Sequence, residues 1–222
     1  AGARLSLNQD GSVQLQVGAT EIGQGADTVF SQMAAETLHM DISRVHIVTQ
    51  QDTDVTPFDT GAYASRQSFV TGTAVKECAQ QLKQKILEYA RTLVPGNVDR
   101  LELEDGYILA DGKPAISLED LAMESYYSLS NSSVLTAEVS RQVKKNTVAS
   151  GCCFAEVEVD MKLGKIKVLD IVNVHDSGTL LNPQLAAMQV HGGMFMGIGY
   201  GVSEQLLIDE KTGRPLNGTL LD

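Results

Sequence analysis

Hydrophobic and polar residues alternate at the start of the chain, as they do in strands that turn one face toward a core. Leu5 and Leu7 precede turn residues at 8–11, and residues 13–17 continue with the same period of two. The pattern predicts two strands joined as a hairpin.

A glycine-bearing loop follows, and the spacing of the hydrophobic residues then changes to three and four. This spacing, from Ala26 to Thr37, is typical of an amphipathic helix. A strand is predicted at residues 44–49, a polar loop at 50–63, and then a long helix that ends before Pro95-Gly96. The first part of the chain is therefore predicted to mix strands and helices.

Residues 98–149 interrupt this order and are interpreted as an inserted connection. A small hairpin is predicted around residues 101–112. A short helix is predicted after Ser117, because Asp120 stands three residues later in the pattern of a capping box.

The opening pattern repeats in the last part of the chain. Residues 154–159 and 166–171 alternate around a turn, and a helix is predicted to begin with Asn182 as its cap and Pro183 at its first position. We therefore predict an α+β fold built from two hairpin-loop-helix units. The first unit spans residues 1–97, the inserted hairpin and short helix span 98–149, and the second unit spans 150–222.

Composition and charge restrict the classes of partner. The chain of 222 residues carries 28 acidic and 17 basic residues, for a formal net charge of −11, which argues against a nucleic-acid partner. No hydrophobic run approaches the roughly 20 residues of a membrane span, so we expect no membrane partner and a cytoplasmic location. The spacing of Cys78, Cys152 and Cys153 suits neither zinc nor a disulfide framework, and we expect buried thiols.

The loop "GATEIGQGADTVF", residues 18–30, is the first candidate for chemistry. Gly23 and Gly25 allow a ligand to approach the backbone closely, and the start of the following helix offers N–H groups to a phosphate or another polar acceptor. Gln24 adds an amide that can donate and accept. The alternative is that the glycines serve only a tight turn.

The stretch "GAYASRQS", residues 61–68, is the second candidate. Small residues precede a group of donors at the start of the long helix, an arrangement that favours anion binding. The alternative is that Ser65 is only a helix cap and Arg66 a solvated charge.

The stretch "QVHGGMFMGIGYG", residues 189–201, places five glycines in a predicted helix. Each glycine costs up to about 1 kcal/mol relative to alanine, so close packing against a backbone or a bulky buried ligand must compensate. Gln189 could reach such a ligand.

The remaining polar residues are weaker candidates for a functional site. His175 and Asp176 lack the partners of a catalytic triad or a metal site, and we interpret the histidine as structural. Four acidic loop residues are expected to be solvated rather than paired as general acid and base; they are Glu21, Asp52, Asp54 and Asp59.

Taken together and in this order, the three stretches resemble the C-terminal cofactor-binding half of the molybdenum subunit in the xanthine dehydrogenase and aldehyde oxidase family. The bacterial three-subunit xanthine dehydrogenases are the most similar members. The resemblance covers residues 4–222 and is least distinctive at 98–149.

The resemblance implies a molybdenum cofactor, a molybdopterin with or without an appended nucleotide, in which no protein side chain ligates the metal. It also implies the residues that contact the cofactor. They are Gly23, Gln24, Gly25, Ala64, Ser65, Arg66, Gln67, Ser68 and Gln189.

The activity that the resemblance implies is hydroxylation of a purine such as hypoxanthine or xanthine, with water as the oxygen source. Electrons then pass through Fe-S clusters and FAD, on partner subunits or domains, to NAD. In the family a glutamate base follows a glycine beyond the glycine-rich helix, so it is expected past Asp222, and no catalytic residue is assigned in this chain.

The chain is therefore expected to be a fragment that is inactive alone and that self-associates through hydrophobic faces. Its expected partners are the N-terminal half of the same subunit, an Fe-S subunit and an FAD subunit. The alternatives are a hydroxylase of an aldehyde or another N-heterocycle, a non-catalytic module for molybdopterin storage or insertion, and an unrelated nucleotide-binding domain.

Overall fold

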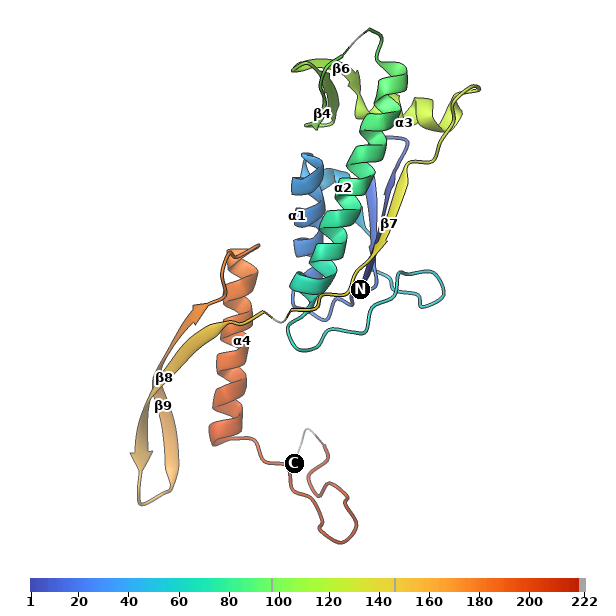
Figure 1. The fold of residues 1–222 in the computed structure, drawn as a ribbon. Coiled ribbons are helices and arrows are strands. Elements are labelled where there is room, and N and C mark those ends of the chain that lie inside the picture. Colours follow the sequence, from blue (N-terminus) through green and yellow to red (C-terminus); the bar gives the residue numbers. More distant parts are fainter. Residues whose placement is uncertain (97, 146, 220–222) are drawn as a thin grey trace. The chain divides into compact units, whose positions relative to one another are not determined.

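The computed structural model describes residues 1–96, 98–145 and 147–219. The chain divides into two compact units, Ala1–Thr147 and Val148–Asp222, which we call the N-terminal and the C-terminal unit (Figure 1). Each is described by itself.

A four-stranded sheet organises the N-terminal unit, with the strand order β3-β2-β1-β7. Strand β1 is antiparallel to both β2 and β7, whereas β2 and β3 are parallel. The helix α1 lies between β2 and β3 in the sequence, as parallel neighbours require a long connection. The strands are β1 (Gly2–Leu7), β2 (Val13–Val17), β3 (Val45–Ile47) and β7 (Thr136–Ser140).

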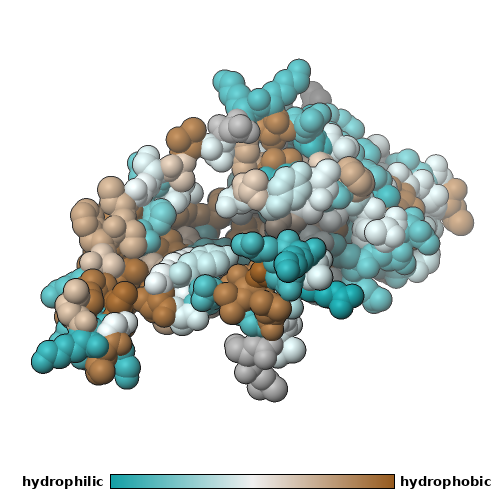
Figure 2. All heavy atoms as spheres, turned by 90° about the horizontal axis from the view of Figure 1, so that it is seen from below, coloured by the Kyte–Doolittle hydropathy of each residue, from teal (hydrophilic) through white to brown (hydrophobic). Residues whose placement is uncertain are grey.

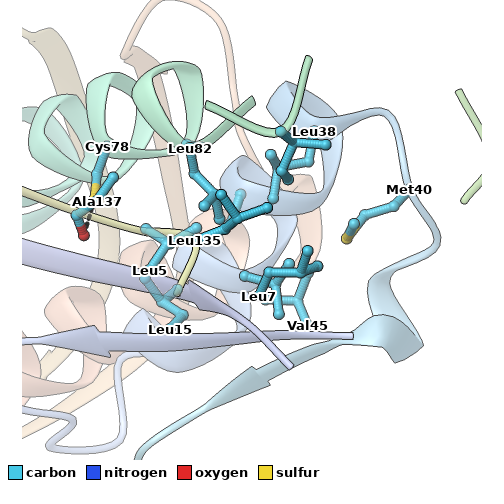
Figure 3. Packing of buried hydrophobic residues seen from close by; sticks show 14 of the residues in the cluster. Leu5, Leu7, Leu15, Leu38, Met40, Val45, Cys78, Leu82, Leu135 and Ala137 are labelled. Carbon is cyan, nitrogen blue, oxygen red and sulfur yellow. Dashed lines mark hydrogen bonds between the residues drawn. The ribbon is translucent and has the colours of Figure 1, made fainter. Parts of the chain in front are cut away.

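Two helices, α1 (Ala26–Leu38) and α2 (Gln67–Leu93), lie side by side in the N-terminal unit, and α2 also contacts β1 and β7 (Figure 1). The alternating hydrophobic residues of the strands are buried in one core with these helices, and Figure 3 shows Leu5, Leu15, Leu38 and Leu82 in that core. The intervening strand residues are polar, and Arg4 forms an ion pair with Glu138 at 2.8 Å. The predicted hairpin and both helices are confirmed.

The region after α2 contains more strands than the sequence predicted. A three-stranded antiparallel sheet is formed by β4 (Leu101–Glu104), β5 (Tyr107–Ala110) and β6 (Lys113–Ser117), where only a hairpin was expected. The helix α3 (Leu118–Tyr127) begins at the predicted cap, because the backbone N–H of Asp120 donates to the Ser117 hydroxyl at 3.0 Å.

Strand β7 was not predicted at all. Its pairing with β1 makes part of residues 98–149 a component of the N-terminal sheet. The predicted division of the chain after residues 97 and 149 stays a prediction. In the sequence, the boundary between the two compact units lies between Thr147 and Val148.

The C-terminal unit consists of a hairpin followed by a helix. The hairpin is formed by β8 (Ser150–Asp160) and β9 (Lys165–Asp176). The N-terminal unit also contains a short 3-10 helix, η1 (Ile42–Arg44), and the described residues of the C-terminal unit contain no such helix. The helix α4 (Pro183–Val202) is capped as predicted, since the Asn182 side chain accepts from the N–H of Leu185 at 3.0 Å. The α+β class and the hairpin-loop-helix order are confirmed.

None of the described residues of the C-terminal unit is buried. Its exposed hydrophobic residues include Phe195 and Tyr200 on α4. Hydrophobic residues at the molecular surface appear in brown in Figure 2. Self-association of the chain stays a prediction.

Buried thiols were expected for all three cysteines, and the structure confirms this for one of them. Cys78 is buried, and its thiol lies 3.2 Å from the carbonyl oxygen of Ala137 (Figure 3). Cys152 and Cys153 are exposed, so the prediction of buried thiols is wrong for these two, which lie on a strand without a covered face. In the described part of the chain, no helix is both long enough and hydrophobic enough to span a bilayer.

Candidate functional site

The glycine-bearing loop between β2 and α1 is organised by a carboxylate. Glu21 accepts hydrogen bonds from the backbone N–H groups of Gly23 at 2.7 Å, Gly25 at 3.1 Å and Asp27 at 3.1 Å. Gly23 and Gly25 have φ angles of 99° and 85°, which side chains disfavour, so glycine is needed there. The expectation that Glu21 is solvated is wrong, because the loop folds around it.

The carboxylate changes what this loop can bind. Burial tends to raise the pKa of Glu21, but the N–H donors outweigh it and lower the pKa below the ordinary value. Burial, and then the negative charge of Glu21, raise the pKa of Asp27 in the first turn of α1. The start of α1 thus already holds an anion, and a second anion is disfavoured there.

A pair of glutamines joins the first loop to the start of α2. The Gln24 amide nitrogen donates to the carbonyl of Thr20 at 3.0 Å and to the side-chain oxygen of Gln67 at 2.5 Å. Gln67 donates in turn to the Thr20 carbonyl at 3.1 Å, and the Ile22 N–H donates to the Gln24 side-chain oxygen at 2.7 Å. Both N–H donors of Gln24 are used, so what it can offer a ligand is the second lone pair of its oxygen.

The second loop contains a buried ion pair. The Arg66 Nη1 atom lies 2.5 Å from the Asp59 Oδ1 atom and 3.0 Å from the Gly61 carbonyl, and the Asp59 side chain is 0% exposed. Asp59 also accepts from the Gly61 N–H at 3.0 Å and the Thr71 hydroxyl at 2.8 Å. The guanidinium lies 5.5 Å from the ring centroid of Tyr63. The prediction that Asp59 is solvated is therefore wrong. Arg66 is not a solvated charge either, which was the alternative left open for it.

The ionised form of Asp59 is the stable one. Its burial favours the neutral acid, but the hydrogen bonds from Gly61, Arg66 and Thr71, together with the positive charge of Arg66, lower the pKa below its ordinary value. The loop therefore contains a neutralised pair rather than a free cation.

The backbone between this ion pair and α2 is strained. Ala64 and Ser65 have φ angles of 53° and 52°, a conformation that costs roughly 1–2 kcal/mol for each residue with a side chain. Helix α2 begins at Gln67 without a side-chain cap, with Arg66 at the cap position, so Ser65 is not the cap. Ser65 and Ser68 are exposed at a helix start that retains its positive dipole.

The two loops lie against each other. A Cβ atom at Gly18 would overlap the Pro57 carbonyl, so the end of β2 approaches the second loop closely. The Gln51 side chain also donates to the carbonyl of Ala19 and accepts from the Thr20 hydroxyl. Residues 23–25 and 64–68, separated in sequence, thus border one region of the N-terminal unit.

The third predicted stretch belongs to the C-terminal unit. Gln189 lies exposed on α4, and a Cβ atom at Gly192, Gly193, Gly197 or Gly201 would meet no atom within 4 Å. At Gly199 a Cβ atom would overlap the Glu204 side chain, whereas the close approach expected at the other four glycines has no partner within the described residues of the C-terminal unit. His175 and Asp176 end strand β9, and the described ranges contain no group of three or more metal-ligating side chains.

Residues 1–222, the entire chain, match the family model described as the molybdopterin cofactor-binding domain. The chain belongs to this family. This chain is 49% identical to the putative xanthine dehydrogenase molybdenum-binding subunit XdhA of Escherichia coli K12, over 100% of this chain and 30% of that protein. It is 32% identical to the probable hypoxanthine oxidase XdhD of the same strain, over 99% of this chain and 23% of that protein.

Solved structures agree with this membership. Quinoline 2-oxidoreductase from Pseudomonas putida 86 matches with a TM-score of 0.84 and 26% identity, over 100% of this chain and 29% of that one. The reconstituted CO dehydrogenase from Oligotropha carboxidovorans gives the same TM-score and identity, with 28% of its chain covered. The chain spans between 23% and 30% of the length of these four relatives.

The residues of these two loops fit a pterin that carries a phosphate. Gln24 offers an acceptor to a ring N–H group, and the uncapped start of α2 beside Ser65 and Ser68 offers donors to an anion. Sequence reasoning missed Glu21 and Asp59 as organisers of the loops. The signal was present, because Glu21 precedes glycines by two and four residues and Asp59 precedes Gly61 by two.

Proposed function

We propose that this chain is the cofactor-binding portion of a molybdenum hydroxylase that oxidises a purine, hypoxanthine or xanthine, with water as the oxygen source. The observation that carries the proposal is the 49% identity, over the whole chain, to a xanthine dehydrogenase molybdenum-binding subunit. The two bordering loops, joined by Gln24 and Gln67 and with the Arg66 charge balanced by Asp59, supply the polar surface that such a cofactor needs.

In this proposal the loops divide the recognition of the cofactor. The oxygen of Gln24 accepts from the pterin ring, while Gly23 and Gly25 let it approach the backbone. Ala64, Ser65, Arg66, Gln67 and Ser68 provide backbone and side-chain donors to the pterin and its phosphate, and Gln189 adds a contact from α4. The first loop binds the neutral ring rather than the phosphate, since Glu21 would repel a second anion.

The bound cofactor supplies a two-electron oxidation in which a ring C–H and water become C–OH, two protons and two electrons. The residues of this chain hold the cofactor and orient it. The general base, a glutamate, is assigned to a part of the subunit outside this chain, and the substrate pocket is completed by the N-terminal half of the same subunit. We place the complex in the cytoplasm.

The two electrons require an acceptor chain. We propose Fe-S clusters and FAD on partner subunits, with NAD as the final acceptor. A different substrate class is the second candidate, because nicotine 6-hydroxylase of Paenarthrobacter nicotinovorans and the aldehyde oxidoreductase PaoC of Escherichia coli K12 are each 27% identical to this chain.

The test is an assay of the full-length molybdenum subunit, expressed with its partner subunits. Hypoxanthine and xanthine are incubated in ¹⁸O-labelled water, and label in the product is measured together with NADH. We expect one ¹⁸O atom for each NADH formed. Turnover of only an aldehyde or a non-purine heterocycle would reassign the substrate, and bound pterin without any turnover would favour a storage or insertion module.

A further inference from the structure

We propose that Asp59 is a positioning residue for the cofactor: its carboxylate holds residues 61–68 in the conformation that presents their donors. The inference rests on the proposed function of that loop. Asp59 itself does not touch the cofactor in this proposal and acts through Gly61 and Arg66.

Asp59 connects three points of the chain. Its Oδ1 atom accepts from the backbone N–H of Gly61 at 3.0 Å and from Arg66 at 2.5 Å, and its Oδ2 atom accepts from Thr71 at 2.8 Å. Thr71 lies in the second turn of α2 and is buried. One carboxylate therefore fixes the start of the loop, its end and the helix that follows.

The contacts close a ring around the strained residues. Besides bonding to Asp59, the Arg66 Nη1 atom donates to the Gly61 carbonyl at 3.0 Å. Gly61 and Arg66 thus clamp the segment that contains Ala64 and Ser65, both with positive φ. Such a conformation persists only where its surroundings impose it, and the carboxylate and guanidinium pair does so here.

Charge balance also assigns the role of Arg66. A guanidinium bonded to a fully buried carboxylate and lying beside the Tyr63 ring is not a free cation for a phosphate. The donors available for an anion are then the backbone at the start of α2 and the exposed Ser65 and Ser68. The charge of Arg66 therefore acts on the loop, and Arg66 contributes to cofactor binding as a hydrogen-bond donor rather than as a free cation.

The test uses Asp59→Asn in the full-length molybdenum subunit within its complex. The amide keeps the shape of the side chain and an acceptor for Gly61, but it loses the charge that pairs with Arg66. The readouts are the pterin released per subunit and the molybdenum content, with the thermal unfolding midpoint measured in parallel. Glu138→Gln is the matched control, because it makes the same change in the exposed ion pair with Arg4.

We expect Asp59→Asn to lower pterin content at least fivefold, with Glu138→Gln at the wild-type level. A second comparison, between two substitutions of Arg66, distinguishes a positioning role from a general loss of folding. Because a single nitrogen of Arg66 makes both contacts, Arg66→Lys should keep more pterin than Arg66→Ala. If Asp59→Asn does not fold, Thr71→Val tests the positioning role instead. It removes one hydrogen bond to the Asp59 carboxylate and should lower pterin content about twofold, and an unchanged pterin content would contradict the role.

Wild-type pterin content in Asp59→Asn, or equal losses in Arg66→Lys and Arg66→Ala, would overturn the positioning role and leave the proposed function intact. Absence of pterin from the wild-type complex would overturn both.

Discussion

The side-chain nitrogen of Gln24 lies 2.5 Å from the side-chain oxygen of Gln67, although 43 positions separate the two residues in sequence. Gln24 belongs to the loop before α1, whereas Gln67 is the first residue of α2 and is buried. Both amides also bond to the carbonyl of Thr20. The two loops that border the candidate site are therefore fixed to each other by side-chain hydrogen bonds. A substitution that moves one loop should also move the other.

The first prediction concerns this pair. Gln67→Leu keeps a similar volume but removes the acceptor of Gln24 and the donor to Thr20, so the free energy of unfolding should fall by about 1–3 kcal/mol. The pterin content of the full-length subunit should fall as well. Gln84→Leu is the control, because Gln84 is exposed on the same helix and bonds only to Glu88 among the contacts described. Equal effects of the two substitutions in urea unfolding would contradict the prediction.

The second prediction concerns the pH dependence of stability. The pKa of Glu21 is lower in the folded protein than its ordinary value of 4.5, so the stability it contributes is complete above that value and is lost as pH falls through the folded-state pKa. Glu21→Gln should therefore destabilise the protein near neutral pH, and the difference from wild type should shrink below about pH 4.5.

The measurement for Glu21 is the free energy of unfolding in urea at a series of pH values. Glu36→Gln, at the exposed far end of α1, is the matched control and should not reproduce the pH dependence of the difference. A difference between wild type and Glu21→Gln that does not change between pH 7 and pH 3 would show that the carboxylate is not held as described.

The third prediction concerns Cys78. Burial raises the pKa of its thiol to about 11, so almost no nucleophilic thiolate is present at pH 8. Iodoacetamide should leave Cys78 unmodified in the native protein and alkylate it after denaturation, as read by peptide mass spectrometry. Rapid alkylation of Cys78 in the native state would contradict its placement in the core.

The fourth prediction tests the core between α2 and the sheet. Leu82 is 0% exposed, and Leu82→Ala should lower the free energy of unfolding by about 2–5 kcal/mol through lost burial and the cavity left behind. Leu129→Ala makes the same chemical change at a fully exposed position and should be close to neutral. Urea unfolding of both variants checks the contrast, and similar losses would mean that the assigned core is wrong.

Much of the fold could be predicted because its elements have a clear local period. The strand alternation up to Val17, the spacing in α1 and α2 and the caps at Ser117 and Asn182 are all written in neighbouring residues. Strand β7 escaped prediction because it is short and its place depends on pairing with β1, more than a hundred residues earlier. Non-local pairing of this kind leaves little trace in a local pattern.

The candidate site could be predicted as a set of segments but not as a network. The glycines and the donors at the start of α2 were visible in the sequence, whereas the burial of Asp59 and the capture of Glu21 by backbone N–H groups were not. An acidic loop residue has the same appearance in the sequence whether it is solvated or enclosed. Its environment is decided by tertiary contacts, here Arg66 and the turns of the loops.

The position of β1 also bears on how the protein matures. This strand lies between β2 and β7, with Gly2 opposite Ser140 and Ala3 opposite both Val17 and Val139. On a ribosome the first strand emerges long before its second neighbour, and closing so long a loop is slow. The sheet that supports the loops at residues 18–25 and 57–66 is complete only after residue 140 has been synthesised. If the cofactor binds at these loops as proposed, its loading therefore follows translation of the N-terminal unit.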